Sequence, residues 1–230
     1  MIQVIYEDNH IIVVEKPFNI PTQEDESGDL DLLSMVKEYV RVKYNKPGEA
    51  YIGMVHRLDR VAGGVMVFAR TGKAASRLSE QIRNRTFEKE YLTVVEGRLR
   101  SDSAHLTDHL LKDNNSNTVR VVPKEHPGAK EAKLSYELLE RKEGLDLLQV
   151  QLYTGRPHQI RVQFSSRGCP IWGDGKYSSA YKSKKGIALW SHKITFEHPT
   201  KKEKMTFGSI PPMAPPWDIF RSIENMQEDR

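Results

Sequence analysis

Hydrophobic and polar positions alternate from the beginning of the chain. Residues 4–17, VIYEDNHIIVVEKP, hold two apolar runs that an Asp-Asn pair separates and Pro17 closes. This pattern is typical of two strands joined by a turn. The same reasoning predicts single strands at 64–71 and 86–97, and hairpins at 132–155 and 188–209.

Four segments have helical patterns. Residues 30–44 carry apolar side chains at helical spacing and end before Pro47-Gly48, and residues 72–85 form an amphipathic pattern with a basic last turn. The sequence also predicts a helix over 156–168 and a short, proline-led helix within 211–223. Residues 101–117 are polar and are expected to form a loop-like surface hairpin.

Strands dominate these elements, and hairpins connect most of them. The sequence therefore predicts an α+β fold, with a mixed, largely antiparallel sheet flanked by helices rather than a doubly wound parallel sheet. We find no internal repeat and no low-complexity linker in the 230 residues, so residues 1–230 are expected to form one domain.

Composition narrows the class of protein. Hydrophobic residues make up 38% of the chain and charged residues 29%, which is typical of a soluble globular protein. No apolar run approaches the roughly 18 residues of a membrane span, and the N-terminus lacks the zones of a signal peptide. We therefore expect a cytoplasmic protein without a membrane partner. No apolar stripe is left over for self-association, which favours a monomer.

Several kinds of site are excluded or disfavoured. The single cysteine, Cys169, rules out an internal disulfide and a multi-cysteine metal site. No glycine pattern matches a phosphate-binding or dinucleotide-binding loop, so no nucleotide cofactor is expected. His105 and His109 have no suitable third ligand close in sequence, so a metal site there is less favoured than a plain surface hairpin. The net charge of +4 is compatible with a polyanionic partner.

Residues 54–64, MVHRLDRVAGG, hold one acid among several bases. Arg57 and Arg60 flank Asp59, and their charge keeps the carboxyl group ionised. An ionised carboxylate can serve as a nucleophile, a general base or an electrostatic stabiliser. Considered alone, however, such a cluster is more often a structural ion pair.

A second cluster lies in YTGRPHQIRVQF, which contains Arg156, His158 and Arg161. If the segment is helical, His158 and Arg161 share a face, and planar guanidinium groups suit phosphate. A contact to RNA or phosphate and a solvated helix surface are equally compatible with this pattern. Tyr91 lies within a predicted strand and is either part of the core or an aromatic platform for a nucleobase.

Five segments together resemble the RluA-type RNA pseudouridine synthases, over residues 2 to 210. They are VIYEDNHIIVVEKP, HRLDR, EKEYLTVVEG, TGRPHQIRVQFSSRGCPIWGDGKY and ALWSHKITFEHP. The resemblance implies a fold with a central RNA-binding cleft, and isomerisation of uridine in ribosomal or transfer RNA without metal or organic cofactor. The chain is similar to short members that lack a preceding RNA-binding domain.

The resemblance also implies roles for individual residues. Asp59 matches the catalytic aspartate, Tyr91 the tyrosine that stacks on the target uracil, and Arg161 the basic residue paired with the aspartate. Arg57 matches the arginine that fills the space left by the flipped nucleotide, and Ile160 and Leu189 match apolar positions near the base. We expect Arg60, Arg156 and His158 to form a basic rim that holds the RNA backbone.

The chain departs from the family after HRLDR. Val61, Ala62 and Gly63 stand where many members carry an Asp-Thr-Ser or similar triplet. This change motivates an alternative hypothesis, a catalytically lapsed RNA-binding or RNA-chaperone protein on the same scaffold. A hydrolase of a small phosphorylated compound is less favoured, because no second acid lies near Asp59 in the sequence.

Overall fold

The computed structural model describes residues 2–113, 115–181, 183 and 185–228. The chain divides into two compact units. The first unit comprises Met1–Glu88 and Ser191–Ser209, and the second comprises Lys89–Trp190 and Ile210–Arg230. No helix among the described residues is both long enough and apolar enough to cross a membrane.

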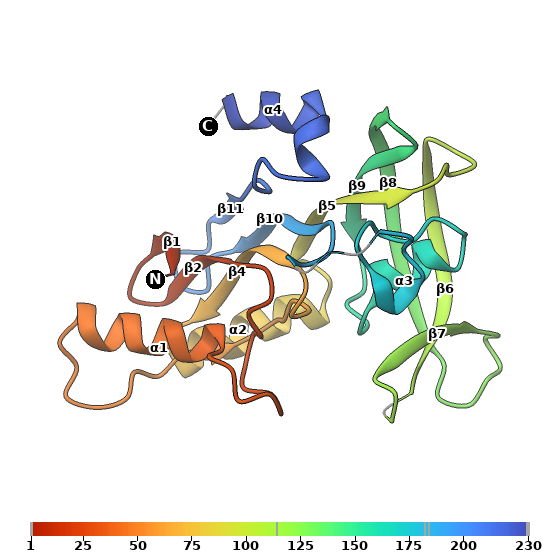
Figure 1. The fold of residues 1–230 in the computed structure, drawn as a ribbon. Coiled ribbons are helices and arrows are strands. Elements are labelled where there is room, and N and C mark those ends of the chain that lie inside the picture. Colours follow the sequence, from red (N-terminus) through yellow and green to blue (C-terminus); the bar gives the residue numbers. More distant parts are fainter. Residues whose placement is uncertain (1, 114, 182, 184, 229–230) are drawn as a thin grey trace. The chain divides into compact units, whose positions relative to one another are not determined.

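The first unit is a sheet with two helices (Figure 1). Its strands lie in the order β1 (Gln3–Glu7), β2 (Ile11–Lys16), β4 (Gly63–Ala69), β10 (Leu189–Glu197) and β11 (Lys204–Gly208), with β3 (Gly53–Met54) also paired to β4. The pairs β1–β2, β2–β4, β3–β4 and β10–β11 are antiparallel. The helices are α1 (Leu32–Lys43) and α2 (Gly72–Arg83).

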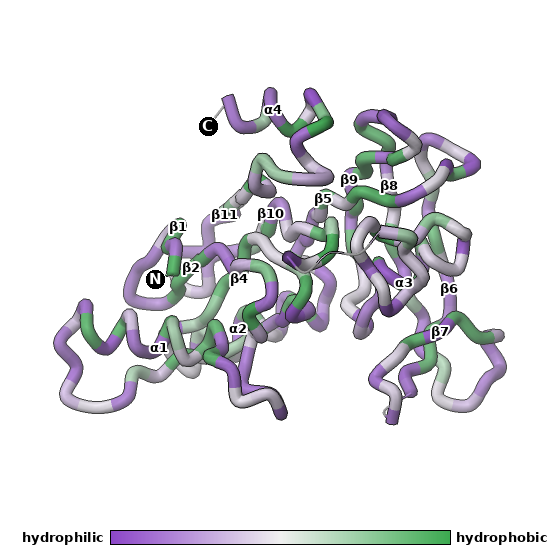
Figure 2. The backbone as a smooth tube through the Cα atoms, viewed as in Figure 1, coloured by the Kyte–Doolittle hydropathy of each residue, from purple (hydrophilic) through white to green (hydrophobic). Residues whose placement is uncertain are grey.

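Local sequence accounts for most of these boundaries. The Asp31 side chain caps α1 by accepting the N–H of Ser34, and Thr71 caps α2 by accepting the N–H of Ala74. In the β1–β2 turn, Asp8 Oδ1 accepts the N–H group of His10 at 2.8 Å. The tube through α1 alternates between green and purple in Figure 2, as expected for a helix with one buried face.

The core of the first unit lies between its sheet and α2. The alternate β4 residues Val65, Val67 and Ala69 are fully buried there, and the rings of Phe87 and Phe196 stack with centroids 5.2 Å apart. Strand β4 requires glycine at Gly64, where φ is +116° and a Cβ atom would lie 2.3 Å from the Ser191 carbonyl oxygen. The backbone at Gly64 therefore packs directly against the backbone of β10.

The second unit is a sheet in the order β5 (Glu88–Glu96), β9 (Leu145–Leu152), β8 (Lys130–Lys142), β6 (Ser103–Asp113) and β7 (Thr118–Val122), all antiparallel. Helix α3 (Gln159–Ser165) packs on one face, where Val162 joins a core cluster with Leu110, Val119, Ala132 and Tyr177. Two 3-10 turns, Gly175–Tyr177 and Trp217–Ile219, and helix α4 (Arg221–Glu228) complete it.

The structure confirms the predicted α+β class with a largely antiparallel sheet and flanking helices. Three details differ. Residues 103–113 form an eleven-residue strand, which pairs with β7 as a hairpin but is not loop-like. The predicted helix over 156–168 is confined to Gln159–Ser165, and the short helix predicted within 211–223 is a 3-10 turn, Trp217–Ile219, followed by α4 from Arg221. His158 has a left-handed backbone with φ of 50°, so it precedes the helix and does not share a helical face with Arg161.

Candidate active site

Asp59 lies in the loop between β3 and β4, hereafter the Asp59 loop (residues 55–62). The loop ends in a turn in which the Ala62 N–H donates to the Asp59 carbonyl oxygen at 3.0 Å. Leu58 is buried, and Thr22 Oγ1 donates to its carbonyl oxygen at 2.8 Å. Asp59 is half-buried and Arg57 is exposed. The backbone around Asp59 is therefore held firmly, while its side chain retains access to solvent.

Lys16 supports this loop through hydrogen bonds to its backbone, and it was not among the predicted site residues. Its side chain is completely buried, and Nζ donates to the carbonyl oxygens of Pro17 at 3.0 Å, Arg60 at 3.1 Å and Ala62 at 2.6 Å. Burial lowers the pKa of Lys16 to about 7, although the nearby Asp59 carboxylate raises it, and the charge of Arg60 lowers it further. Lys16 thus ties the end of β2 to both sides of the turn after Asp59.

Replacing Lys16 by Met should destabilise the first unit. Three carbonyl groups would lose a buried donor, and each buried polar group left unsatisfied costs about 1–3 kcal/mol. We therefore expect the free energy of unfolding, measured in urea at 25 °C, to fall by about 2–4 kcal/mol. An exposed lysine, Lys46, provides the control: Lys46→Met should change it by less than about 0.5 kcal/mol.

The stability lost in Lys16→Met should increase with pH. The pKa of Lys16 falls from 10.5 to about 7 on folding, so between these values the unfolded chain binds more protons than the folded one. The contribution of this group to stability therefore rises with pH from about 7 to 10.5 and is constant below pH 7. The stability difference between wild type and Lys16→Met should grow over this window, and an equal difference at pH 6 and pH 9.5 would contradict the assignment.

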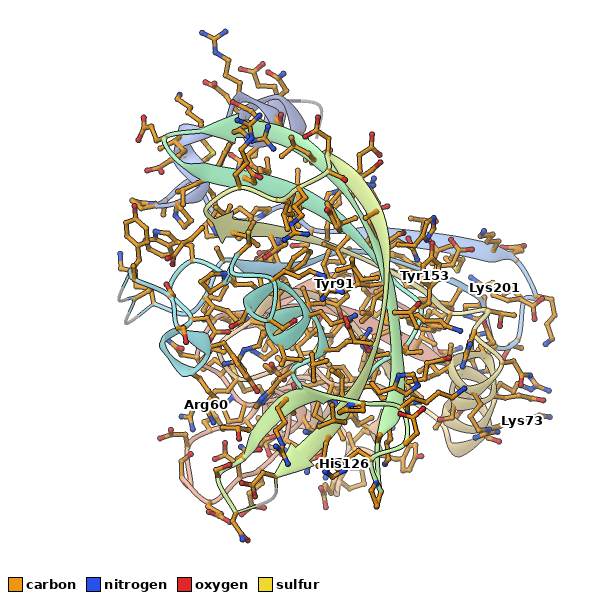
Figure 3. The ribbon with its side chains drawn as sticks, turned by 90° about the vertical axis from the view of Figure 1, so that its right-hand side faces the viewer. Arg60, Lys73, Tyr91, His126, Tyr153 and Lys201 are labelled. Atoms are coloured by element: carbon orange, nitrogen blue, oxygen red, sulfur yellow. The ribbon has the colours of Figure 1, made fainter. Side chains whose placement is uncertain are left out.

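Arg60, which Figure 3 labels, makes contacts with the loop between β2 and α1. Its guanidinium group pairs with Asp25 at 3.4 Å and with Asp29, and donates to Ser27 Oγ at 2.9 Å. These ion pairs are exposed, so each contributes little to stability. Arg60 thus forms ion pairs with Asp25 and Asp29. A contact of Arg60 with RNA stays a prediction.

The remaining predicted site residues lie in the second unit. Tyr91 is on β5 opposite Val150, and is buried, with 6% of its surface exposed. Ile160 and Arg161 are buried in the first turn of α3, and Leu189 is buried at the beginning of β10. The structure thus carries the aromatic side chain and the arginine on two rigid elements, a strand and a helix.

Arg161 forms a bidentate ion pair with Asp174. Its Nε donates to Oδ2 at 2.7 Å and its Nη2 to Oδ1 at 2.8 Å, and both side chains are almost fully buried. The guanidinium carbon also lies 5.0 Å from the centre of the Tyr177 ring. Asp174 orients the guanidinium plane. It was not among the predicted site residues, although GDGKY belongs to one of the resembling segments.

Arg156 and His158 lie just before α3. Arg156 Nε donates to the Glu131 carbonyl oxygen at 2.9 Å, and its backbone N–H donates to Gln159 Oε1 at 3.1 Å. His158 Nδ1 shares a hydrogen bond of 2.7 Å with the Tyr177 hydroxyl group. The His158 ring therefore has a structural partner, whereas Arg156 keeps both terminal amino groups for other contacts.

No group of three or more His, Cys, Asp or Glu side chains among the described residues has the arrangement of a metal site. His105 and His109 are both on β6, and the His105 ring stacks on Tyr153. Cys169 is buried, and burial raises the pKa of its thiol, which disfavours a nucleophilic role. The side chains best suited to catalysis or substrate binding are the Asp59 carboxylate in the first unit and the Tyr91 and Arg161 side chains in the second.

Comparison with known proteins identifies the family. A family model described as RNA pseudouridylate synthase matches residues 10–166. An uncharacterized RNA pseudouridine synthase of Aquifex aeolicus is 34% identical over 99% of this chain and 73% of its own length. One from Bacillus subtilis is 32% identical over 88% of this chain and 66% of its own. Ribosomal large subunit pseudouridine synthase C of Vibrio parahaemolyticus is 32% identical over 90% of this chain and 64% of its own length.

Solved structures give the same fold. Human RNA pseudouridylate synthase domain containing 4 matches with a TM-score of 0.76 at 20% identity, covering 91% of this chain and 88% of that one. The chain spans about two thirds of the length of several curated relatives. These matches include the segment with Asp59 and the segment with Arg161, and they confirm the resemblance found in the sequence: the chain belongs to the RNA pseudouridylate synthase family.

Proposed function

We propose that this protein isomerises uridine in RNA to pseudouridine, with Asp59 as the catalytic carboxylate. The observation that carries the proposal is the family match over residues 10–166, which includes the Asp59 loop. In the first unit Lys16 donates two hydrogen bonds to the turn after Asp59, at the carbonyl oxygens of Arg60 and Ala62.

The reaction breaks the bond between N1 of uracil and C1′ of ribose and joins C1′ to C5 of the same base. C5 loses its proton and N1 gains one. No atom is gained or lost, so neither an oxidant nor a second substrate is needed. An ionised carboxylate can attack the sugar or remove a proton from it. The target base must first leave the stack, because its reactive atoms are otherwise inaccessible.

The roles of the other residues follow from the resemblance and form part of the proposal. Tyr91 stacks on the detached uracil, Ile160 and Leu189 contact the base, and Arg161 is the basic residue that the family pairs with the catalytic aspartate. Arg57, which is exposed, fills the space left by the flipped nucleotide. Arg60, Arg156 and His158 belong to the basic surface that holds the RNA backbone. We propose that residues 1–230 act as a single catalytic domain and as a monomer.

Large-subunit ribosomal RNA is the substrate class that we favour. Relatives from Vibrio and Haemophilus are named ribosomal large subunit pseudouridine synthase C, and one from Xanthomonas is named synthase D. Transfer RNA is the other class compatible with the family. Both RNA classes are found in the cytoplasm, which is where we propose the enzyme acts.

Pseudouridine mapping tests this proposal directly. Purified protein is incubated with unmodified large-subunit ribosomal RNA and transfer RNA transcribed in vitro, and every uridine is mapped by carbodiimide labelling and primer extension. We expect one or a few uridines of the ribosomal RNA to be converted. The proposal fails if no uridine reacts in either RNA while a related synthase modifies its own site in the same reaction mixture.

A further inference from the structure

A cavity of about 240 Å³ lies in the second unit, lined by residues of β6, β7, β8 and the segment before α3. Its lining residues do not include Asp59, Tyr91 or Arg161. Pockets that take drug-sized ligands have roughly 300–1,000 Å³. This one is smaller, so its size suits a single flat ring system rather than a larger ligand.

The sheet register explains how the cavity combines apolar and basic side chains. Leu110 is opposite Lys130 of β8, and Lys112 is opposite Val119 of β7. Opposite residues in an antiparallel pair extend from the same face of the sheet. Leu110 and Val119 are almost fully buried and, with Pro157, form an apolar floor, while both lysines are exposed at its edge.

The three cations at this cavity are uncompensated. Lys112, Lys130 and Arg156 line it, and none forms an ion pair with any residue in the described part of the chain. Three other arginines of the second unit do have an acidic partner: Arg141 pairs with Asp146, Arg161 with Asp174 and Arg167 with Asp108. A local excess of positive charge beside an apolar floor is complementary to a nucleotide, which joins an anionic phosphate to a flat base.

We propose that this cavity binds one unpaired nucleotide of the RNA substrate, separate from the uridine that is isomerised. The base lies on Leu110, Val119 and Pro157, and the flanking phosphates contact Lys112, Lys130 and the free amino groups of Arg156. The inference rests on the proposed function, since it takes RNA as the substrate. It gives the β6–β7 hairpin a part in selecting the RNA that is modified, because the substrate must offer a second unpaired base besides the target uridine.

Binding measurements on the whole protein test the phosphate contacts. The probe is a fluorescein-labelled uridine 12-mer, with affinity measured by anisotropy between 50 and 300 mM salt. Lys112→Ala/Lys130→Ala should weaken binding about tenfold and reduce the slope of log K against log salt by about 1.4, since each lost single-strand phosphate contact accounts for about 0.7. Lys46→Ala/Lys73→Ala is the control, because both lysines are exposed and without an ion pair among the described residues, and Figure 3 labels Lys73 on α2.

A second variant tests the base contact. Leu111 also lines the cavity, and Leu111→Trp fills part of it without changing the charge. We expect this variant to lose the preference of the wild type for the uridine 12-mer over an abasic 12-mer, with an unchanged salt slope. Circular dichroism and the melting temperature verify its folding, and the double lysine variant keeps the test decisive if Leu111→Trp unfolds.

Three outcomes overturn the inference. One is equal binding by the two double lysine variants, and another is equal affinity of the wild type for the uridine and abasic probes. The third is binding of a glutamate 12-mer as tightly as RNA, which would indicate a site for acidic peptides. Pseudouridine formation by the same preparations separates this inference from the proposed function. If the protein is active but the binding effects are missing, only the nucleotide site is refuted. If the binding effects are present but the protein is inactive, only the proposed enzymatic function is refuted.

Discussion

Asp59→Asn should abolish pseudouridine formation while the protein still binds RNA. The substitution keeps the size of the side chain but removes the negative charge that a nucleophile or general base needs. A positioned acid–base group alone contributes about 10²–10⁴-fold to a rate, so we expect turnover to fall at least about 1,000-fold. Single-turnover pseudouridine formation on the mapped RNA measures this loss, and a filter-binding assay measures the affinity.

RNA affinity should stay within about threefold of wild type or increase slightly, because removing a negative charge does not weaken attraction to a polyanion. Glu49→Gln is the matched control, since Glu49 is an exposed acid of the same unit whose partner is Lys37. It should retain full turnover. If Asp59→Asn keeps more than a tenth of the wild-type rate, Asp59 is not the catalytic carboxylate.

Asp174→Asn should cause a large loss of stability and also reduce turnover. Asp174 and Arg161 are 1% and 6% exposed, so the substitution removes the Asp174 charge from its bidentate pair with a buried guanidinium group. Breaking a buried pair by removing one partner costs about 3–5 kcal/mol. The amide still accepts one of the two hydrogen bonds, so we expect the free energy of unfolding in urea to fall by about 3 kcal/mol.

A double variant shows whether Asp174→Asn loses stability through its effect on charge or through its effect on packing. Arg161→Met added to Asp174→Asn also removes the buried positive charge that faced Asp174, and it should recover at least half of the lost stability. Glu197→Gln is the control for an exposed pair, because Glu197 and Lys202 are 49% and 60% exposed, and it should cost less than about 1 kcal/mol. A loss below 1 kcal/mol for Asp174→Asn would show that the pair does not carry buried charge.

Local sequence was sufficient to predict many elements. The alternation in residues 4–17 corresponds to β1 and β2, and the pattern over 72–85 corresponds to α2, with Thr71 as its cap. These segments were predictable because each has a buried face with the period of its own secondary structure. The order of the strands in the sheets had no such local signal, because pairing depends on contacts between segments far apart in the chain.

Strands β6 and β7 show where local reasoning was insufficient. Polar side chains such as His105, Thr107 and Asp108 made residues 103–113 resemble a loop, yet Leu106 and Leu110 of this strand are buried. The strand forms because β8 and β7 supply hydrogen-bonding partners on both sides, and because α3 covers its apolar residues. Its polar face remains in solvent, so its composition is that of a surface segment.

The sequence by itself determined the family and the candidate catalytic residue, because HRLDR and the other segments are contiguous motifs that can be recognised without coordinates. It also placed Tyr91 on a strand and Arg161 on a helix, where the structure has them. Only the tertiary structure revealed the supports of these residues. Lys16 is 43 positions before Asp59, and Asp174 is 13 positions after Arg161. A hydrogen bond or ion pair between such positions depends on how the chain folds back, and this is a property of packing that no local pattern encodes.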